Sequence, residues 1–214
     1  MVRWSIVIDL RKCIGCQACA IVCKQTNSVP LNKWRRVVDC GVCDPPDRQR
    51  IFVPMSCMHC NTPSCMEVCP TKATYRRSDG IVDIKYQRCV GCGYCIVACP
   101  YHARSIVFHD KSEFLMKTIE QESVERDKNF DRIGICTKCN LCMTRIDDGM
   151  SKGLQPGIDP EASPMCVISC SANALHFGDI DDPDSNVSQL ILNNKTVCLQ
   201  EELGTHPSVY YIFQ

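Results

Sequence analysis

The sequence lacks the features that would place a chain in a membrane or on nucleic acid. No apolar run approaches the ~20 residues of a spanning helix, so we expect no direct membrane span. Its 24 basic and 24 acidic residues cancel, which leaves no field favouring nucleic acid. The opening stretch MVRWSIVIDL is too short for a secretory signal peptide, so we expect a cytoplasmic chain.

Several kinds of reactive site are missing as well. There is no C-x-x-C-H for attached haem c, and no C-x3-C-x2-C for radical chemistry on S-adenosylmethionine. No Ser/His/Asp set, carboxylate pair or phosphate-binding loop stands out. We therefore predict no catalytic residue in this chain.

Cysteine is the dominant feature, with 20 among 214 residues. Most of these residues stand in C-x2-C and C-x3-C steps, which is typical of metal sites in a reducing compartment. Thiols this crowded make a disulfide framework improbable. The four groups are Cys13, Cys16, Cys19, Cys23; then Cys57, Cys60, Cys65, Cys69; then Cys89, Cys92, Cys95, Cys99; and finally Cys136, Cys139, Cys142 with Cys166, Cys170.

A short structural unit recurs around these groups. The β-branched runs at 5–10, 51–55 and 80–84 predict strands that lead into cysteine loops. After the last cysteine of groups two, three and four we expect a helical turn or two and a return strand. Residues 24–56 look like a surface excursion, 150–165 a loop, and 111–132 an amphipathic helix.

The run C-x2-C-x2-C-x3-C is the ligand spacing of bacterial ferredoxins. Three thiolates hold one [4Fe–4S] cube, and the fourth reaches the neighbouring cube. Gly15 and Gly91 sit where the loop must turn tightly, and Pro70 and Pro100 complete the C-P ending. Zinc binds C-x2-C pairs too, but a structural zinc site gives no reason for a triplet followed by C-x3-C-P.

The separation of the groups along the sequence indicates which two groups supply ligands to the same pair of [4Fe–4S] clusters. Only residues 70–88 separate groups two and three, so we pair them, which leaves groups one and four as the other pair. The predicted ligands are Cys13, Cys16, Cys19, Cys170 (cluster 1); Cys23, Cys139, Cys142, Cys166 (cluster 2); Cys69, Cys89, Cys92, Cys95 (cluster 3); and Cys57, Cys60, Cys65, Cys99 (cluster 4). The fold is then α+β, with an inner ferredoxin-like unit at 57–100 inserted in an outer unit at 1–56 plus 101–214.

Group four allows a second assignment. Cys136, Cys139 and Cys142 can also be taken as a triplet, but we favour Cys139, Cys142 and Cys166, because Cys166 and Cys170 then form the usual C-x3-C step. Four cysteines are left without a role, namely Cys40, Cys43, Cys136 and Cys198. A zinc site at Cys40 and Cys43 stays open beside two free surface thiols.

Three further polar residues have ordinary explanations. We expect His59 to be a solvent-facing loop histidine, although a contact near the cluster is the alternative. His176 is expected to be a half-buried strand residue. Arg145 either forms a plain salt bridge or offsets charge at the cluster beside Cys142.

The order of the groups, with CMHCNTPSC in the second and GDIDDPDSNVSQL near the end, resembles a known family. It is similar to the four-cluster iron–sulfur subunits of dimethyl sulfoxide reductase-type enzymes. The stretch 157–190 and ELGTHPSVYY look most like the phenylacetyl-CoA:acceptor oxidoreductase type, with polysulfide and thiosulfate reductases as near relatives. The four cysteines without a role are departures from the family.

The resemblance implies a large catalytic partner carrying a molybdenum or tungsten bis-pterin cofactor, and often a membrane anchor that exchanges electrons with quinone. By analogy, cluster 1 lies nearest the catalytic subunit, followed by clusters 2, 3 and 4. Arg145, three places after Cys142, fits the family's pattern. Export together with a signal-bearing partner would make the chain periplasmic, which is the alternative to the cytoplasm or the cytoplasmic membrane face.

We therefore predict an electron-transfer subunit with four [4Fe–4S] clusters and no substrate site of its own. The rival hypotheses are a free-standing polyferredoxin carrier, a structural zinc protein, and a redox enzyme that uses Cys40 and Cys43.

Overall fold

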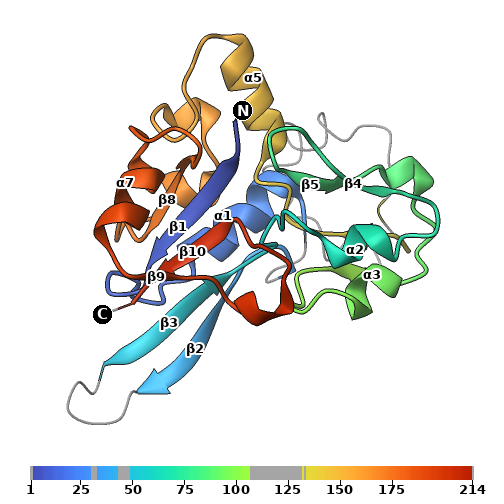
Figure 1. Cartoon of the computed structure of the whole chain (residues 1–214), viewed down its shortest axis with the longest axis horizontal. Helices are drawn as coiled ribbons and strands as arrows, with labels where there is room; N and C mark the ends of the chain where they lie inside the picture. Colours follow the sequence, from blue (N-terminus) through green and yellow to red (C-terminus); the bar gives the residue numbers. More distant parts are fainter. Residues whose placement is uncertain (1, 30–32, 43–48, 107–131, 133, 214) are drawn as a thin grey trace.

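The computed structural model describes residues 2–29, 33–42, 49–106, 132 and 134–213. Its largest sheet contains β1 (Trp4–Asp9), β8 (Leu175–Asp179), β9 (Thr196–Val197) and β10 (Val209–Ile212), in the order β8-β1-β10-β9. Strand β1 runs antiparallel to β8 and parallel to β10. The first strand of the chain is thus held by its last segments (Figure 1).

Alternation along β1 decides which core each side chain enters. All six residues of WSIVID are buried. Ile6 and Ile8 belong to the main core, whereas Val7 belongs to a smaller core with Val187 of α7 (Asn186–Asn193). Successive strand residues face opposite sides, so a continuous apolar run is what a sheet covered on both faces requires.

The inner segment lies beside this sheet (Figure 1). It contains α2 (Ser64–Glu67), the hairpin of β4 (Thr74–Arg76) and β5 (Val82–Ile84), the 3-10 turn η1 (Tyr86–Arg88), and α3 (Tyr94–Val97). Helices α2 and α3 pack against each other. One buried cluster here is formed by Cys65, Ala73, Val82, Ile84 and Cys95 together with Cys136 of a later segment, so cysteines form much of this core.

Residues 24–56 are only in part a surface excursion. Helix α1 (Ala18–Asn27) is followed by the hairpin β2 (Arg36–Val42) and β3 (Arg50–Met55), whose two strands extend away from the body in Figure 1. Trp34 and Arg35, at its base, are only 3% and 2% exposed. The expectation of a surface segment is therefore wrong for this pair. The charged residues beside them in the sequence suggested exposure.

The chain returns to the body through β6 (Ser105–Ile106) and β7 (Cys136–Thr137), which pair antiparallel. Then come α5 (Met143–Ser151), the turn η3 (Pro160–Ala162) and α6 (Met165–Ile168), with η4 (Glu201–Leu203) near the end. The expected loop at 150–165 is confirmed apart from these short helical pieces. The predicted amphipathic helix at 111–132 lies outside the described residues, apart from Arg132.

The three predicted strands are confirmed as β1, β3 and β5, and return strands follow as β4, β6 and β8. The helical turns are displaced from their expected place. Helices α2, α3 and α6 begin one residue before the first cysteine of each C-x3-C step. Pro70 and Pro100, just after the second cysteine, cannot continue a helix, so the turn lies within the step.

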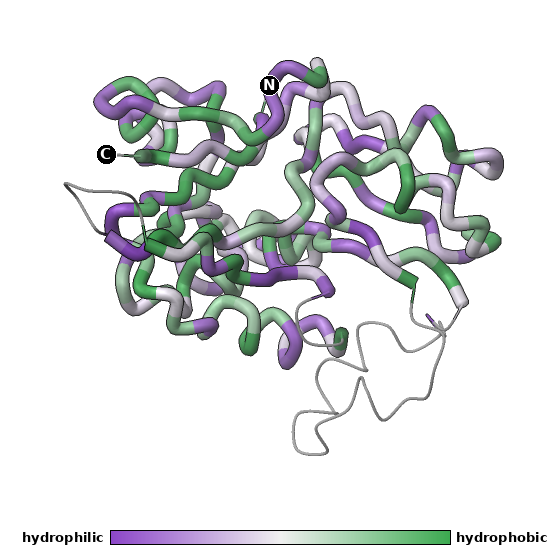
Figure 2. The backbone as a smooth tube through the Cα atoms, turned by 90° about the horizontal axis from the view of Figure 1, so that it is seen from below, coloured by the Kyte–Doolittle hydropathy of each residue, from purple (hydrophilic) through white to green (hydrophobic). Residues whose placement is uncertain are grey.

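Apolar and polar residues alternate along the backbone in short stretches (Figure 2). Within the described ranges, no helix combines the length and apolar character needed to cross a bilayer.

Candidate metal centres

The first predicted set comes together at one end of α1. Cys13, Cys16, Cys19 and Cys170 line one hollow, together with apolar neighbours such as Pro54 and Leu175. Gly15 has φ +71°, and a Cβ there would lie 2.6 Å from the Phe52 ring. The predicted tight glycine turn is confirmed at this position.

The second set lies deeper. Cys23 is buried, and its burial together with the neighbouring thiols of Cys139, Cys142 and Cys166 raises its pKa. Helices α1 and α6 pack against each other. Cys19 and Cys23 are one helical turn apart on α1, and Cys166 and Cys170 bracket the end of α6. Each helix region therefore contributes one sulfur to the first set and one to the second.

The inner segment repeats this arrangement with α2 and α3. Cys69, Cys89, Cys92 and Cys95 line a third hollow. Cys60 faces Cys57, Cys65 and Cys99, which form the fourth set. Here the region of α2 supplies Cys65 and Cys69, and that of α3 supplies Cys95 and Cys99. The structure therefore places the predicted ligands of clusters 1 and 3 around two hollows, and the assignment of all sixteen cysteines to four clusters stays a prediction.

Backbone N–H groups donate hydrogen bonds to cysteine sulfur at equivalent places in the inner pair of sets (three and four) and in the outer pair (one and two). Ala73 N donates to Cys69 Sγ at 3.2 Å, and Ala174 N donates to Cys170 Sγ at 3.3 Å. Both bonds follow the last cysteine of a C-x3-C step. Hydrogen bonds to cluster sulfurs are a principal means by which a protein adjusts such a centre.

Buried side-chain donors provide a second test of fit. Nε and Nη1 of Arg35 and Nη2 of Arg104 have no hydrogen-bond partner among the described residues. Both side chains lie among the cysteine sets. Buried N–H groups without partners are costly, so acceptors such as cluster sulfides suit these positions. The residues present therefore fit [4Fe–4S] clusters.

Burial also raises the pKa values of several of these thiols. Desolvation raises the pKa of Cys19 to about 11, and those of Cys60 and Cys139 to about 12. Without iron these thiols keep their protons at neutral pH. Iron binds the thiolate, so loading of the sites must release protons and is linked to folding of the cysteine loops.

Cys136 has a place that sequence reasoning did not assign. It is only 2% exposed, lines the third hollow, and its Sγ lies 3.4 Å from Cys95 Sγ. Its backbone N–H donates to Cys89 Sγ at 3.4 Å. The alternative triplet of Cys136, Cys139 and Cys142 would require one hollow for all three, whereas Cys139 and Cys142 face Cys23.

The other cysteines without a role lie apart from the four sets as far as the structure describes them. Cys40 is exposed on β2, and Cys198 is partly buried near Pro207 O. Cys43 lies outside the described residues.

His59 is not a solvent-facing residue. It is 1% exposed, and its Nδ1 accepts a hydrogen bond from Val82 N at 3.1 Å. Burial holds its pKa well below the ordinary value. The expectation failed because a strand distant in sequence covers this loop. His176, in contrast, is confirmed as a half-buried residue of β8.

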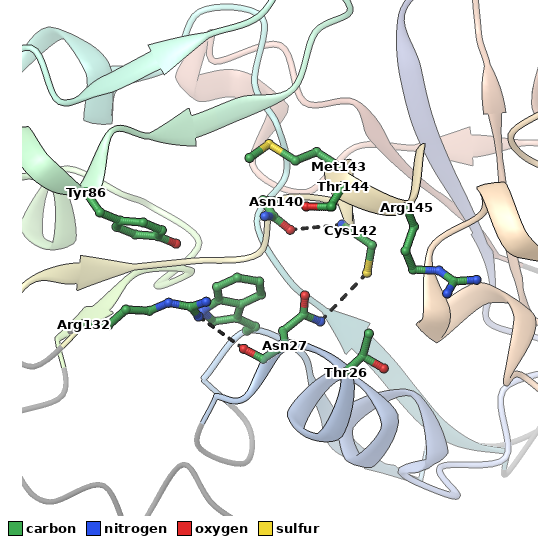
Figure 3. A pocket seen from close by; sticks show the side chains of 10 residues that line it. Thr26, Asn27, Tyr86, Arg132, Asn140, Cys142, Met143, Thr144 and Arg145 are labelled. Carbon is green, nitrogen blue, oxygen red and sulfur yellow. Dashed lines mark hydrogen bonds between the residues drawn. The ribbon is translucent and has the colours of Figure 1, made fainter. Parts of the chain in front are cut away.

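Arg145 forms no salt bridge with a described residue, but its charge lowers the pKa of the Cys142 thiol against the effect of burial, as the second alternative predicted. Its Nε donates to Ser163 O at 3.0 Å and its Nη2 to Pro160 O at 2.7 Å. Figure 3 shows this side chain directed away from the Cys142 sulfur. Its observed role is to hold the loop that precedes α6, and this loop leads directly to Cys166.

Figure 3 shows a cavity of about 80 Å³ beside Cys142. Arg132 lies between the rings of Trp34 and Tyr86, and donates to Asn27 O at 3.2 Å. Asn27 Nδ2 lies 3.9 Å from Cys142 Sγ. The cavity is well below the ~300 Å³ of small substrate pockets.

Three buried cations were missed entirely. Arg35, Arg104 and Lys138 are at most 4% exposed. Lys138 Nζ donates to Cys139 O at 2.7 Å and to Val82 O, which ties group four to the inner segment. Charged residues usually lie on the surface, so the residue types indicated exposure. The neighbouring cysteines were the only feature of the sequence that pointed to burial.

Comparison with known proteins agrees with this geometry. The family described as 4Fe-4S dicluster domain matches residues 48–180. A Halobacterium salinarum protein, named as an iron-sulfur subunit of dimethyl sulfoxide reductase, is 40% identical, over 99% of this chain and 79% of that protein. A selenate reductase subunit of Mesobacillus selenatarsenatis is 38% identical, over 99% of this chain and 72% of that protein.

A polysulfide reductase component of Wolinella succinogenes is 33% identical, over 98% of this chain and 94% of that protein. The resemblance predicted from the cysteine groups is confirmed at the level of the family. The finer likeness to phenylacetyl-CoA:acceptor oxidoreductases stays a prediction. This protein belongs to the 4Fe–4S dicluster family and, within it, to the electron-transfer iron–sulfur subunits of dimethyl sulfoxide reductase-type oxidoreductases.

Proposed function

We propose that this chain holds four [4Fe–4S] clusters and relays electrons between a molybdenum or tungsten bis-pterin catalytic subunit and a second acceptor. The acceptor is a quinone-linked membrane anchor or a soluble carrier. The observation that supports the proposal most is that the cysteines assigned to clusters 1 and 3 each line one hollow. In the proposed assignment, three cysteines of every set come from one sequence group and the fourth comes from the group paired with it.

The clusters supply one-electron chemistry, and the residues of this chain hold and insulate them. Four thiols in each set leave no iron position free for a substrate. The N–H groups of Ala73 and Ala174 donate to thiolate sulfur, which favours the more negative reduced state. Burial of Cys23 and Cys139 keeps water from the interior pair of sulfurs.

Exchange of cysteines between neighbouring sets supports the two-unit division. The inner unit is 57–100, with clusters 3 and 4, and the outer unit is 1–56 plus 101–214, with clusters 1 and 2. Lys138 lies between Cys139 of the outer unit and Val82 of the inner one, which supports direct contact between the pairs. We propose the order 1, 2, 3, 4 from the catalytic subunit outward.

The names of the relatives support a partner. The selenate reductase and polysulfide reductase relatives are each named as one part of a larger enzyme. We propose the same for this chain, at the cytoplasmic membrane face or, if exported with its partner, in the periplasm. The substrate belongs to the partner.

Affinity purification of the tagged chain from an anaerobic lysate of its own cells tests the proposal. Expected is a large co-purifying chain containing molybdenum or tungsten and pterin. A loaded monomer that copurifies with no pterin-containing chain and shuttles between enzymes would instead favour the free-standing polyferredoxin.

A further inference from the structure

Two buried arginines lie among the cysteines of the four sets. Arg35 is 2% exposed and Arg104 is 4% exposed. Within the described part of the chain, neither pairs with a carboxylate. An arginine keeps its charge under all ordinary conditions, and a buried charge without a counter-ion is strongly unfavourable. Each position therefore calls for a negative partner.

Arg35 faces both sets of the outer pair. Its Nη2 donates to Cys166 Sγ at 3.2 Å. The thiols whose charges act most on it are Cys166, Cys139, Cys19 and Cys23. Cys19 belongs to the first set, and the other three belong to the second. Its Nε and Nη1 are buried without any protein acceptor among the described residues.

Arg104 occupies the corresponding place in the inner pair. Its Nη1 donates to Thr74 Oγ1 at 3.1 Å and lies 3.9 Å from Cys136 Sγ. The thiols that act most on it include Cys65 and Cys57 of the fourth set and Cys95 of the third. Its Nη2 is buried, and no acceptor for it lies in the described part of the protein.

We infer that Arg35 and Arg104 are equivalent positioning residues, each a fixed positive charge shared by the two clusters of its pair. This inference rests on the proposed function. The unpartnered N–H groups donate to sulfur of the clusters. Each cluster gains one negative charge when it is reduced, and the low dielectric of the interior strengthens the attraction. Both clusters of a pair are therefore easier to reduce than they would be without their arginine.

Two neutral variants test this, Arg35→Gln and Arg104→Gln, each in the full chain loaded anaerobically. The readout is the midpoint potential of every cluster, from redox titration followed by electron paramagnetic resonance. We expect Arg35→Gln to lower the equilibrium constant for reduction of clusters 1 and 2 at least tenfold. This corresponds to a fall of about 59 mV in each midpoint potential. Clusters 3 and 4 keep their potentials, and Arg104→Gln gives the reverse pattern.

Two controls separate charge from shape. Arg36 adjoins Arg35 but donates to Tyr101 O and His102 O rather than to cysteine sulfur. Arg36→Gln should leave all four potentials unchanged. Arg35→Lys keeps the charge and should recover most of the potential lost in Arg35→Gln, which a purely structural role would not produce.

Unchanged potentials in a fully loaded Arg35→Gln protein overturn the inference, as does a shift in one cluster or in all four. If a Gln variant loses iron, the identity of the missing clusters decides whether the inference stands. Loss of both clusters of one pair supports the shared role, and loss of one cluster or of all four contradicts it. These outcomes differ from a failure of the proposed function. In that case the wild-type protein itself would lack the four clusters, whatever the variants show.

Discussion

The Sγ atoms of Cys95 and Cys136 lie 3.4 Å apart in the interior of the inner segment. The hydrogen bond lowers the pKa of Cys95 to about 6, while the same contact and burial raise that of Cys136. Without iron and with both thiols protonated, Cys95 Sγ donates to Cys136 Sγ. The cysteine spacing predicts Cys95 as the iron ligand, and once Cys95 binds iron as a thiolate, the Cys136 S–H is the donor that remains in this contact.

Substitution separates these two roles. Cys136→Ala should keep about 16 iron per chain but make cluster 3 harder to reduce, because one donor to its ligand is lost. Cys95→Ala should cost iron at that cluster. Iron analysis and redox titration of both variants check this, and loss of a whole cluster in Cys136→Ala would refute the assignment.

Two nearby glycines form a matched pair for the cluster loop. Gly91 has φ +68°, and a Cβ there would lie 2.1 Å from Gly134 O. Gly93 has φ +78°, and its Cβ would meet nothing within 4 Å. Gly93→Ala should cost the ~1–2 kcal/mol of left-handed backbone. Gly91→Ala should cost more and lower the occupancy of cluster 3. Equal unfolding midpoints for the two variants would show that the close approach to Gly134 is unimportant.

Trp34 ties the base of the hairpin to group four. Its Nε1 donates to Thr137 Oγ1 at 2.7 Å, and both side chains are buried. Trp34→Phe should cost about 1–3 kcal/mol, since it removes the donor and leaves the hydroxyl short of a partner. In a double-mutant cycle, Thr137→Val should recover part of this loss. Strict additivity of the two changes in unfolding free energy would rule out coupling.

Asp9 predicts a dependence of stability on pH. Its carboxylate is 1% exposed and accepts from Arg11 Nε and Nη2 at 2.9 Å, which lowers its pKa. The folded pKa lies below the unfolded value near 3.9, so the stabilisation is present above about pH 4 and disappears as pH falls through the folded pKa.

Arg11 is partly exposed, so Asp9→Asn should cost only about 1 kcal/mol at pH 7. The difference in melting temperature between the variant and the wild type should shrink below pH 4. Clusters are lost from both proteins in acid, so only this difference is informative. A difference that stays constant from about pH 7 to well below pH 4 would exclude the ion pair as its source.

The sequence alone predicted the strands and the cysteine loops that follow them because both depend on local spacing. Strand β1 is a largely apolar run in which all six residues are buried, and each cysteine loop has a spacing that one cube can fill. The place of the helical turns was less visible, since Pro63, Gly93 and Pro164 start them before the first cysteine of the step.

Residues placed by pairing between distant segments could not be predicted. Cys136 reaches the third set because β7 pairs with β6, where Cys136 lies opposite Ile106. His59 is buried by β5, and Arg35 lies among cysteines from segments distant in sequence. For His59 and Arg35 the residue type suggested the surface, and a non-local contact placed the side chain in the interior.

Iron and acid-labile sulfide per chain, measured on one anaerobic preparation, test the central claim most directly. Four [4Fe–4S] clusters predict about 16 of each per chain, with zinc near zero and all four clusters reducible. A folded preparation with a few zinc and no sulfide, or with about half the expected iron, would contradict four cysteine-ligated clusters in this chain.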